Sequence, residues 1–139
     1  MSVPSRRSMR ERLAALLTTA GNWQAAYNEQ PQSFSGQSPV ATVHGGSVTL
    51  PQETFGTDED LVVELIVTNF VKRADPAAAE DSLDALLVAL LDVVVANQKD
   101  ASGNWDNLFI AGSTEPDYFL VDGKQYRGEV IRVMAEKYV

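Results

Sequence analysis

The segment that most constrains the fold is an apolar stretch, Leu61 to Lys72, followed by a helix that opens at Asp75-Pro76. The stretch is rich in β-branched and aromatic residues, which suit a pleated sheet. One of its two alternating faces is nearly all apolar and the other is mixed. The nearly apolar face consists of Val63, Leu65, Val67, Asn69 and Val71. This pattern predicts a central strand with one face on a core and the other half covered.

Asp75 and Pro76 mark the start of a long helix. An aspartate accepts hydrogen bonds from the free N–H groups of a first turn, and proline suits the first helical position. Apolar residues then recur at helical spacing, at Leu83, Leu86, Leu87, Leu90, Leu91 and Val94. We therefore expect a helix over about residues 76–98 that buries one stripe against the sheet containing Leu61–Lys72.

A second helix is predicted near the N-terminus, over about residues 9–20. Ser8 and Glu11 fit a capping box, and Gly21 is a natural helix end. We expect residues 1–7, which are polar and contain arginine, to be flexible. An arginine-rich amphipathic start is also typical of membrane or transit segments. The acidic residue inside the segment and the lack of a cleavage-like pattern favour a solvated helix face instead.

The remaining strands are predicted to be short. Gly45-Gly46 suggests a hairpin between two of them, and Asp122-Gly123 gives the clearest hairpin signal in the chain. The expected strands are Pro39–His44, Ser47–Leu50, Asn107–Ala111, Tyr118–Val121 and a return strand within Lys124–Val139. The order of elements predicts one α+β domain over residues 1–139. In it, both helices pack on a mostly antiparallel β-sheet.

The charge of the chain is unevenly distributed. The formal net charge is −8, yet residues 1–12 carry +3, from four arginines and one glutamate, so the remainder carries −11. Such an acidic body is a poor nucleic-acid binder, because neutralising phosphates needs clustered lysine and arginine. The chain contains no cysteine and no run of about 18 uncharged apolar residues.

No motif of a common enzyme or metal site is present. His44 is the single histidine, which makes it a weak general base or metal ligand. The carboxylates Asp58, Glu59 and Asp60 could hold a hard cation, but we favour a solvated entry to the following strand. The loop Asn97–Asp106 begins like a calcium loop, yet its glycine falls at the fourth place and no glutamate closes it. We therefore predict no catalytic, cofactor or metal residue.

Aromatic residues in the loops are candidate contacts for a partner. The loop Asn22–Ser38 contains Trp23 and Tyr27, which we expect to tether it to the core, and Phe34, which we expect to meet a partner. Trp105 is expected to anchor its loop. The full set of candidate interaction residues is Phe34, Phe55, Asp58, Glu59, Asp60, Trp105, Glu115 and Asp117.

The order of elements resembles that of the tail-terminator proteins of long-tailed bacteriophages, the minor tail protein U type. In that family an N-terminal helix, an early strand pair and a long strand precede a helix with an acidic opening, which here is Asp81-Ser-Leu-Asp84. The chain closes on a hairpin of Tyr118–Val121 with Tyr126–Val139, and family members likewise end on a long strand of this kind. The final strand alternates charged and apolar residues.

The resemblance implies a structural protein of the virion, located in the tail at the head–tail junction and assembled in the host bacterial cytoplasm. Family members form a ring, usually a hexamer, on the last ring of the tail tube protein. They stop tube growth and offer a docking surface to the head–tail connector protein. The resemblance implies no catalysis, no cofactor, no membrane and no sequence-specific nucleic-acid binding. DNA would pass through the ring.

Other functions remain open at the level of sequence. A head-completion or head–tail connector subunit has the same size and kind of role. A small ligand-binding domain, or an enzyme using convergent carboxylates, belongs to a different class and would show several perturbed acids in a pocket. A third alternative is a chaperone or adaptor with a groove beside the long helix.

Overall fold

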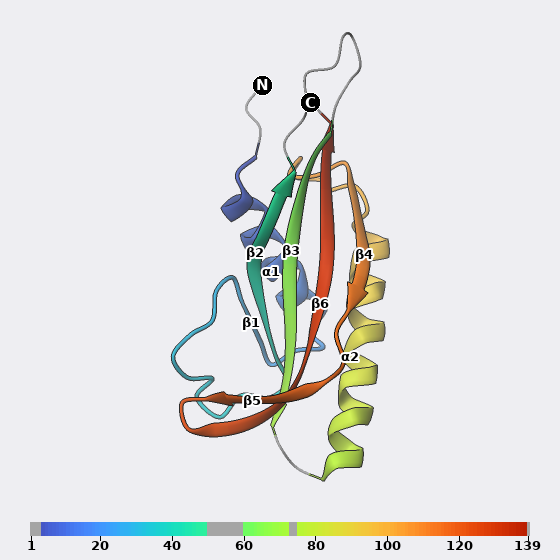
Figure 1. The fold of residues 1–139 in the computed structure, drawn as a ribbon. Coiled ribbons are helices and arrows are strands. Elements are labelled where there is room, and N and C mark those ends of the chain that lie inside the picture. Colours follow the sequence, from blue (N-terminus) through green and yellow to red (C-terminus); the bar gives the residue numbers. More distant parts are fainter. Residues whose placement is uncertain (1–3, 50–59, 73–74, 139) are drawn as a thin grey trace.

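A computed structural model shows an α+β fold, in which a six-stranded, mostly antiparallel sheet carries two helices on one face (Figure 1). The predicted fold class is confirmed. The structure describes residues 4–49, 60–72 and 75–138. The helices are α1 (Arg6–Ala20) and α2 (Pro76–Ala96). The strands are β1 (Ala25–Tyr27), β2 (Val40–Thr49), β3 (Asp60–Lys72), β4 (Asn107–Ser113), β5 (Asp117–Val121) and β6 (Lys124–Tyr138).

The sheet is organised around β3, as predicted. The strand order is β1-β2-β3-β6-β4, and β5 pairs with the first part of β6. β3 pairs antiparallel with β6 along its whole length, from Asp60 opposite Tyr138 to Lys72 opposite Tyr126. Every pairing is antiparallel except that of the short β1 with β2. Because β3 and β4 flank β6, the last strand lies inside the sheet.

The main core lies between the sheet and the two helices. The predicted apolar face of β3 is buried, including Asn69, whose side-chain oxygen accepts a hydrogen bond from the Trp23 indole at 2.9 Å. From α2 the buried residues are Ala79, Leu83, Leu86, Ala89, Leu90, Val93 and Val94. Leu91 was expected in this stripe but is 48% exposed. Leu91 lies about 100° around the helix axis from Leu90. It is therefore outside the side of α2, partly lined by alanines, that packs close to the sheet.

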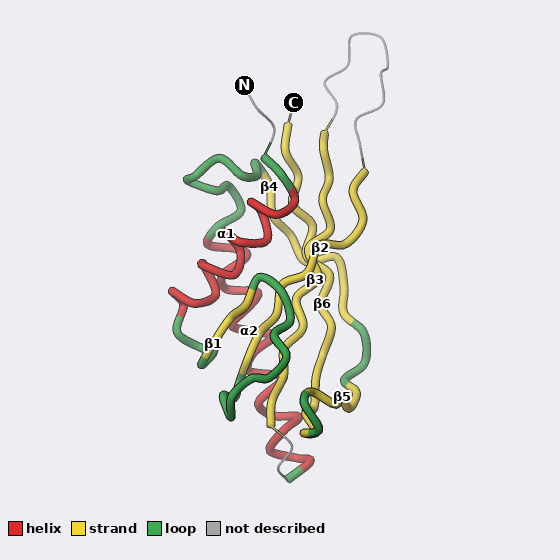
Figure 2. The backbone as a smooth tube through the Cα atoms, turned by 90° about the vertical axis from the view of Figure 1, so that its left-hand side faces the viewer, coloured by secondary structure: helices red, strands yellow, loops and turns green. Residues whose placement is uncertain are grey.

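A smaller core lies on the opposite face of the sheet, at the end where β5 crosses it. Figure 2 shows both helices on one side of the sheet and β5 on the other. The buried residues of this second cluster are Phe34, Val40, Phe70, Val121 and Tyr126. The mixed face of β3 is therefore half covered, as the sequence predicted.

The predicted start of α1 is wrong. The helix begins at Arg6, and the cap is Ser5, whose hydroxyl accepts a hydrogen bond from the Ser8 N–H at 3.0 Å. Glu11 does not close a capping box, because it pairs with Arg7 one turn earlier at 2.8 Å. Arg6 and Arg7 are thus helical and not part of a flexible tail.

The predicted hairpin at Gly45-Gly46 is also wrong, since β2 runs through both glycines with a register shift between Gly45 and Val48. A Cβ at Gly45 would lie 2.7 Å from the Arg6 side chain, and one at Gly46 would lie 2.3 Å from the Glu64 carboxylate. The glycines allow close packing and not chain reversal. By contrast, the Asp122-Gly123 turn is confirmed, with φ values of 50° and 73°.

Candidate interaction surface

Two aromatic residues that we expected to meet a partner are buried instead. Phe34 is 1% exposed, and its ring centre lies 5.0 Å from that of Phe70 and 5.1 Å from that of Tyr126. The loop that follows β1 folds back over the sheet because this aromatic cluster takes Phe34 out of water. Trp105 is fully buried, which fits an anchor but not a contact residue. Because both side chains are buried, neither Phe34 nor Trp105 is placed to contact a partner as we had expected.

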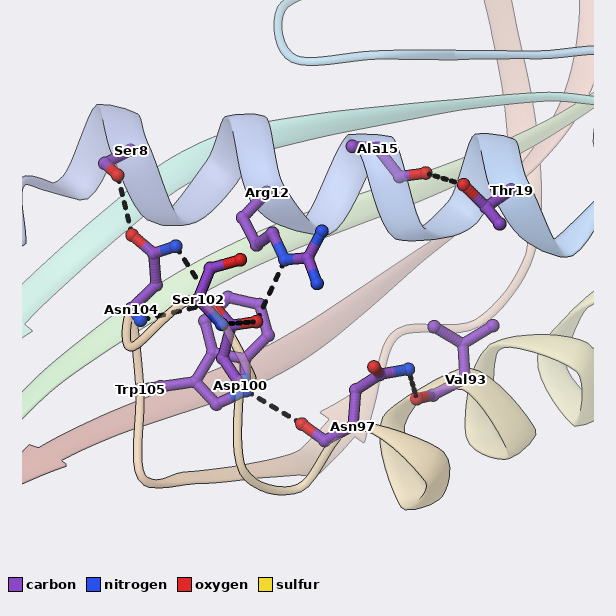
Figure 3. Close-up of polar contacts among 10 residues, drawn as sticks. All are labelled: Ser8, Arg12, Ala15, Thr19, Val93, Asn97, Asp100, Ser102, Asn104 and Trp105. Carbon is purple, nitrogen blue, oxygen red and sulfur yellow. Dashed lines mark hydrogen bonds and ion pairs between the residues drawn. The ribbon is translucent and has the colours of Figure 1, made fainter.

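Trp105 belongs to a network that ties the loop after α2 to helix α1 (Figure 3). Its indole N–H donates to the Asn97 carbonyl at 2.8 Å. The Asp100 carboxylate accepts from the Arg12 guanidinium at 2.9 Å and from the Asn104 side-chain amide at 2.9 Å. It also accepts from the backbone N–H groups of Ser102 and Asn104. All these hydrogen bonds are formed within the chain, so the loop serves to hold the end of α2 against α1.

The charge state of Asp100 follows from this network. Burial acts to raise its pKa, but the hydrogen bonds from Asn104, Arg12 and Ser102 outweigh burial, and the net pKa lies below 3.8. Asp100 is 3% exposed, so its negative charge is stabilised by hydrogen bonds from the protein and not by contact with water. The carboxylate stabilises the fold and is not offered to a ligand.

The other candidate residues are divided between the surface and the part of the chain outside the described residues. Glu115 and Asp117 are exposed, in and just after the connection between β4 and β5. The Asp117 carboxylate accepts a hydrogen bond from the next N–H, that of Tyr118, at 2.8 Å. Asp60 is the first residue of β3. Phe55, Asp58 and Glu59 lie outside the described residues.

The sheet has a half-face that no described element covers. On the side away from the helices, β5 and the Phe34 loop cover one end, and the other end is open in the described structure (Figure 2). The strand registers place Glu64, Met134 and Phe109 in one row across β3, β6 and β4. Phe109 is 41% exposed there. We call this half of the sheet the open face.

An ion pair crosses the open face diagonally. Arg132 lies opposite Ile66, one row away from Glu64, and its guanidinium donates to the Glu64 carboxylate at 2.7 Å. This hydrogen bond is the main cause of the lowered pKa of Glu64. The Arg132 side chain is still 52% exposed. His44 also faces this side, and burial together with the positive charge of Arg10 lowers its pKa.

A second exposed apolar surface lies on α2, on the side away from the sheet. Val88, Leu91 and Val95 are 59%, 48% and 59% exposed. They are three or four residues apart, so they form one patch. The sequence contained the signal, since the helix is apolar almost all round between Ala85 and Ala96. Such a helix has more apolar surface than one contact with its own sheet can bury.

Carboxylates do converge at one place, between α2 and β6. Glu129 is 9% exposed, and burial, followed by the negative charges of Asp84 and Glu80, raises its pKa. Glu80 is paired with Arg127 at 2.7 Å. Among the residues that the structure describes, no group of three or more histidine, aspartate or glutamate side chains could hold a metal ion. No described helix is long and apolar enough to cross a membrane.

Comparisons with known proteins find a likeness among solved structures. No family model matches the sequence, and no curated protein matches it. Among the solved structures that match is a chain described as "Virion of native gene transfer agent (GTA) particle", with a TM-score of 0.48 and 18% sequence identity. The match covers 96% of this chain and 92% of that chain. An overlap of this extent does not identify a shared function.

Proposed function

We propose that the chain is a structural protein of a phage-like virion, and specifically a tail-terminator subunit. In this role it forms a ring, hexameric as in the family that its sequence resembles, on the end of a tail tube. The ring stops addition of further tube subunits and offers a surface to the head–tail connector protein.

One observation carries the proposal: the exposed apolar side chains lie on rigid strands and helices. Phe109 on β4 and the patch of Val88, Leu91 and Val95 on α2 are held by elements that pack on the main core. Apolar surface on a preformed scaffold is typical of a protein that is covered by others in its working state. Association then requires little reordering of the chain.

The charge distribution is compatible with a channel for DNA. Residues 13–139 carry −11, so the body repels phosphates. A ring with an acidic lining lets a genome slide through it, whereas a basic lining would retain it.

The test is to add the purified protein to growing tail tubes. We expect the protein to appear as a cap at one tube end in electron micrographs, and we expect capped tubes to stop lengthening. Addition of an equal amount of an unrelated acidic protein is the control. Tubes that lengthen equally with and without the chain, and that carry no cap, would contradict the proposal.

A further inference from the structure

The two lateral edges of the molecule differ in charge. Helix α1 packs over β1 and β2, whereas α2 packs over β3, β6 and β4, so the helices follow the order of the strands (Figure 1). The N-terminal half of α1 contains Arg6, Arg7, Arg10 and Arg12 with only Glu11 against them. The opposite edge, at α2 and β4, carries carboxylates and apolar side chains.

We define the basic edge by Arg6, Arg7 and Arg10. The Arg6 guanidinium donates to the Gly46 carbonyl at 2.6 Å, and the Arg10 guanidinium donates to the Asn28 carbonyl at 3.0 Å. Both are held by neutral acceptors, and within the described residues neither forms an ion pair. Arg7 pairs with Glu11, but its side chain is 75% exposed. Glu11 and Glu29 both act electrostatically on Arg7, so three arginines outnumber two acids at the basic edge.

We define the acidic edge by Asp84, Leu91 and Val95 of α2, together with β4. Val88 and Asp92 instead line a shallow groove with Leu16 and Thr19 of α1. Asp84 is exposed on the same side of α2 as Leu91, and it is not ion-paired within the described part of the chain.

Strand β4 is an edge strand of the sheet and forms part of the acidic edge. Its sequence, Asn-Leu-Phe-Ile-Ala-Gly-Ser, contains no charge and no proline. In the described structure only β6 pairs with it. Natural sheets protect an exposed edge strand with charges, proline or a β-bulge. β4 has a register shift between Ile110 and Gly112, so its first part, 107–110, is the part without such protection, and we expect it to be covered in the assembly.

We propose that the acidic edge of one copy receives the basic edge of the next copy. This inference rests on the proposed ring and names the surfaces that form it. The two edges are on opposite sides of the molecule and differ in sequence, which is the arrangement that a head-to-tail contact requires. Apolar burial on Leu91 and Val95 stabilises the contact, and the arginines facing Asp84 fix its direction.

The test measures self-association of the full chain by native mass spectrometry and sedimentation. Leu91→Glu and Arg7→Glu should each weaken association at least about tenfold, a change of about 1.4 kcal/mol. Leu120→Glu is the matched control for the first variant, because Leu120 is 69% exposed on β5, which belongs to neither edge as defined. Lys124→Glu, in the exposed hairpin of β5 and β6, is the matched control for the second. Circular dichroism checks that each variant is folded.

A charge swap makes the test specific for a head-to-tail contact. Asp84→Arg alone should weaken association, and the double variant Arg7→Glu with Asp84→Arg should associate more tightly than either single variant. If the wild type forms a ring that both Leu91→Glu and Arg7→Glu leave intact, the proposed edges are wrong and the ring function stands. A wild type that stays monomeric in solution and on tail tubes would overturn both proposals.

Discussion

At the scale of single residues, Asp100 joins parts of the chain that are 88 positions apart. Its partner Arg12 comes from α1, and its other donors come from its own loop. Removing the carboxylate would leave a part-buried guanidinium and two backbone N–H groups without their acceptor. A buried group left unpaired in this way costs more than the net gain from making the bond.

We therefore expect Asp100→Asn to lower the free energy of unfolding by about 3 kcal/mol at neutral pH. Because the folded pKa of Asp100 is depressed below 3.8, its stabilisation is present above that pH and is lost as the pH falls through the folded pKa. The difference in free energy of unfolding between wild type and variant should become smaller as the pH is lowered. Urea unfolding at several pH values measures this. Asp81→Asn, at an exposed position of α2, is the control and should change stability by less than about 0.5 kcal/mol.

At the scale of elements, Gly128 decides how closely β5 can lie on β6. A Cβ there would be 2.7 Å from the Phe119 ring and 3.3 Å from the Asn69 carbonyl oxygen. Gly128→Ala should destabilise the fold by about 1–3 kcal/mol, because the ring has to move out of the second cluster. Phe119→Leu in the same chain should recover part of this loss, and a double-mutant cycle by urea unfolding measures the coupling. Strictly additive effects would contradict the contact.

The same scale shows what sequence reasoning could and could not predict. β3, α2 and the Asp122-Gly123 hairpin have strong local signals, since periodicity and turn chemistry act within a few residues. The glycines of β2 misled the prediction because their neighbours, Arg6 and Glu64, come from other elements. Local sequence does not say whether a glycine is there for a turn or for a close approach.

The candidate surface was predictable only in part, for a similar reason. Phe34 has polar neighbours in sequence, which favoured exposure, but its three-dimensional neighbours are Phe70 and Tyr126. Such clusters depend on which strands pair, and that information is not local. The patch on α2 was different, because the apolar run around Leu91 is visible in the sequence. Of its three residues, only Leu91 was assigned to the core, because a single buried stripe was assumed.

At the scale of the whole molecule, salt separates two ways in which copies could associate. Each copy carries −8, so copies repel one another at long range. If the contact were apolar only, added salt would screen this repulsion and strengthen association. If the basic edge meets the acidic edge, the arginine–carboxylate attraction acts at close range, and salt weakens it.

We predict that association of the wild type weakens as salt rises from about 0.1 M to about 1 M, over which the screening length falls from about 10 Å to about 3 Å. In Arg7→Glu the sign should reverse, because the variant keeps the apolar patch and the net repulsion but loses a cation at the contact. Sedimentation equilibrium across a salt series measures both slopes. A wild-type slope of the same sign as that of Arg7→Glu would mean that the arginines do not face carboxylates of the neighbouring copy. Apolar burial on α2 alone would then hold the ring together.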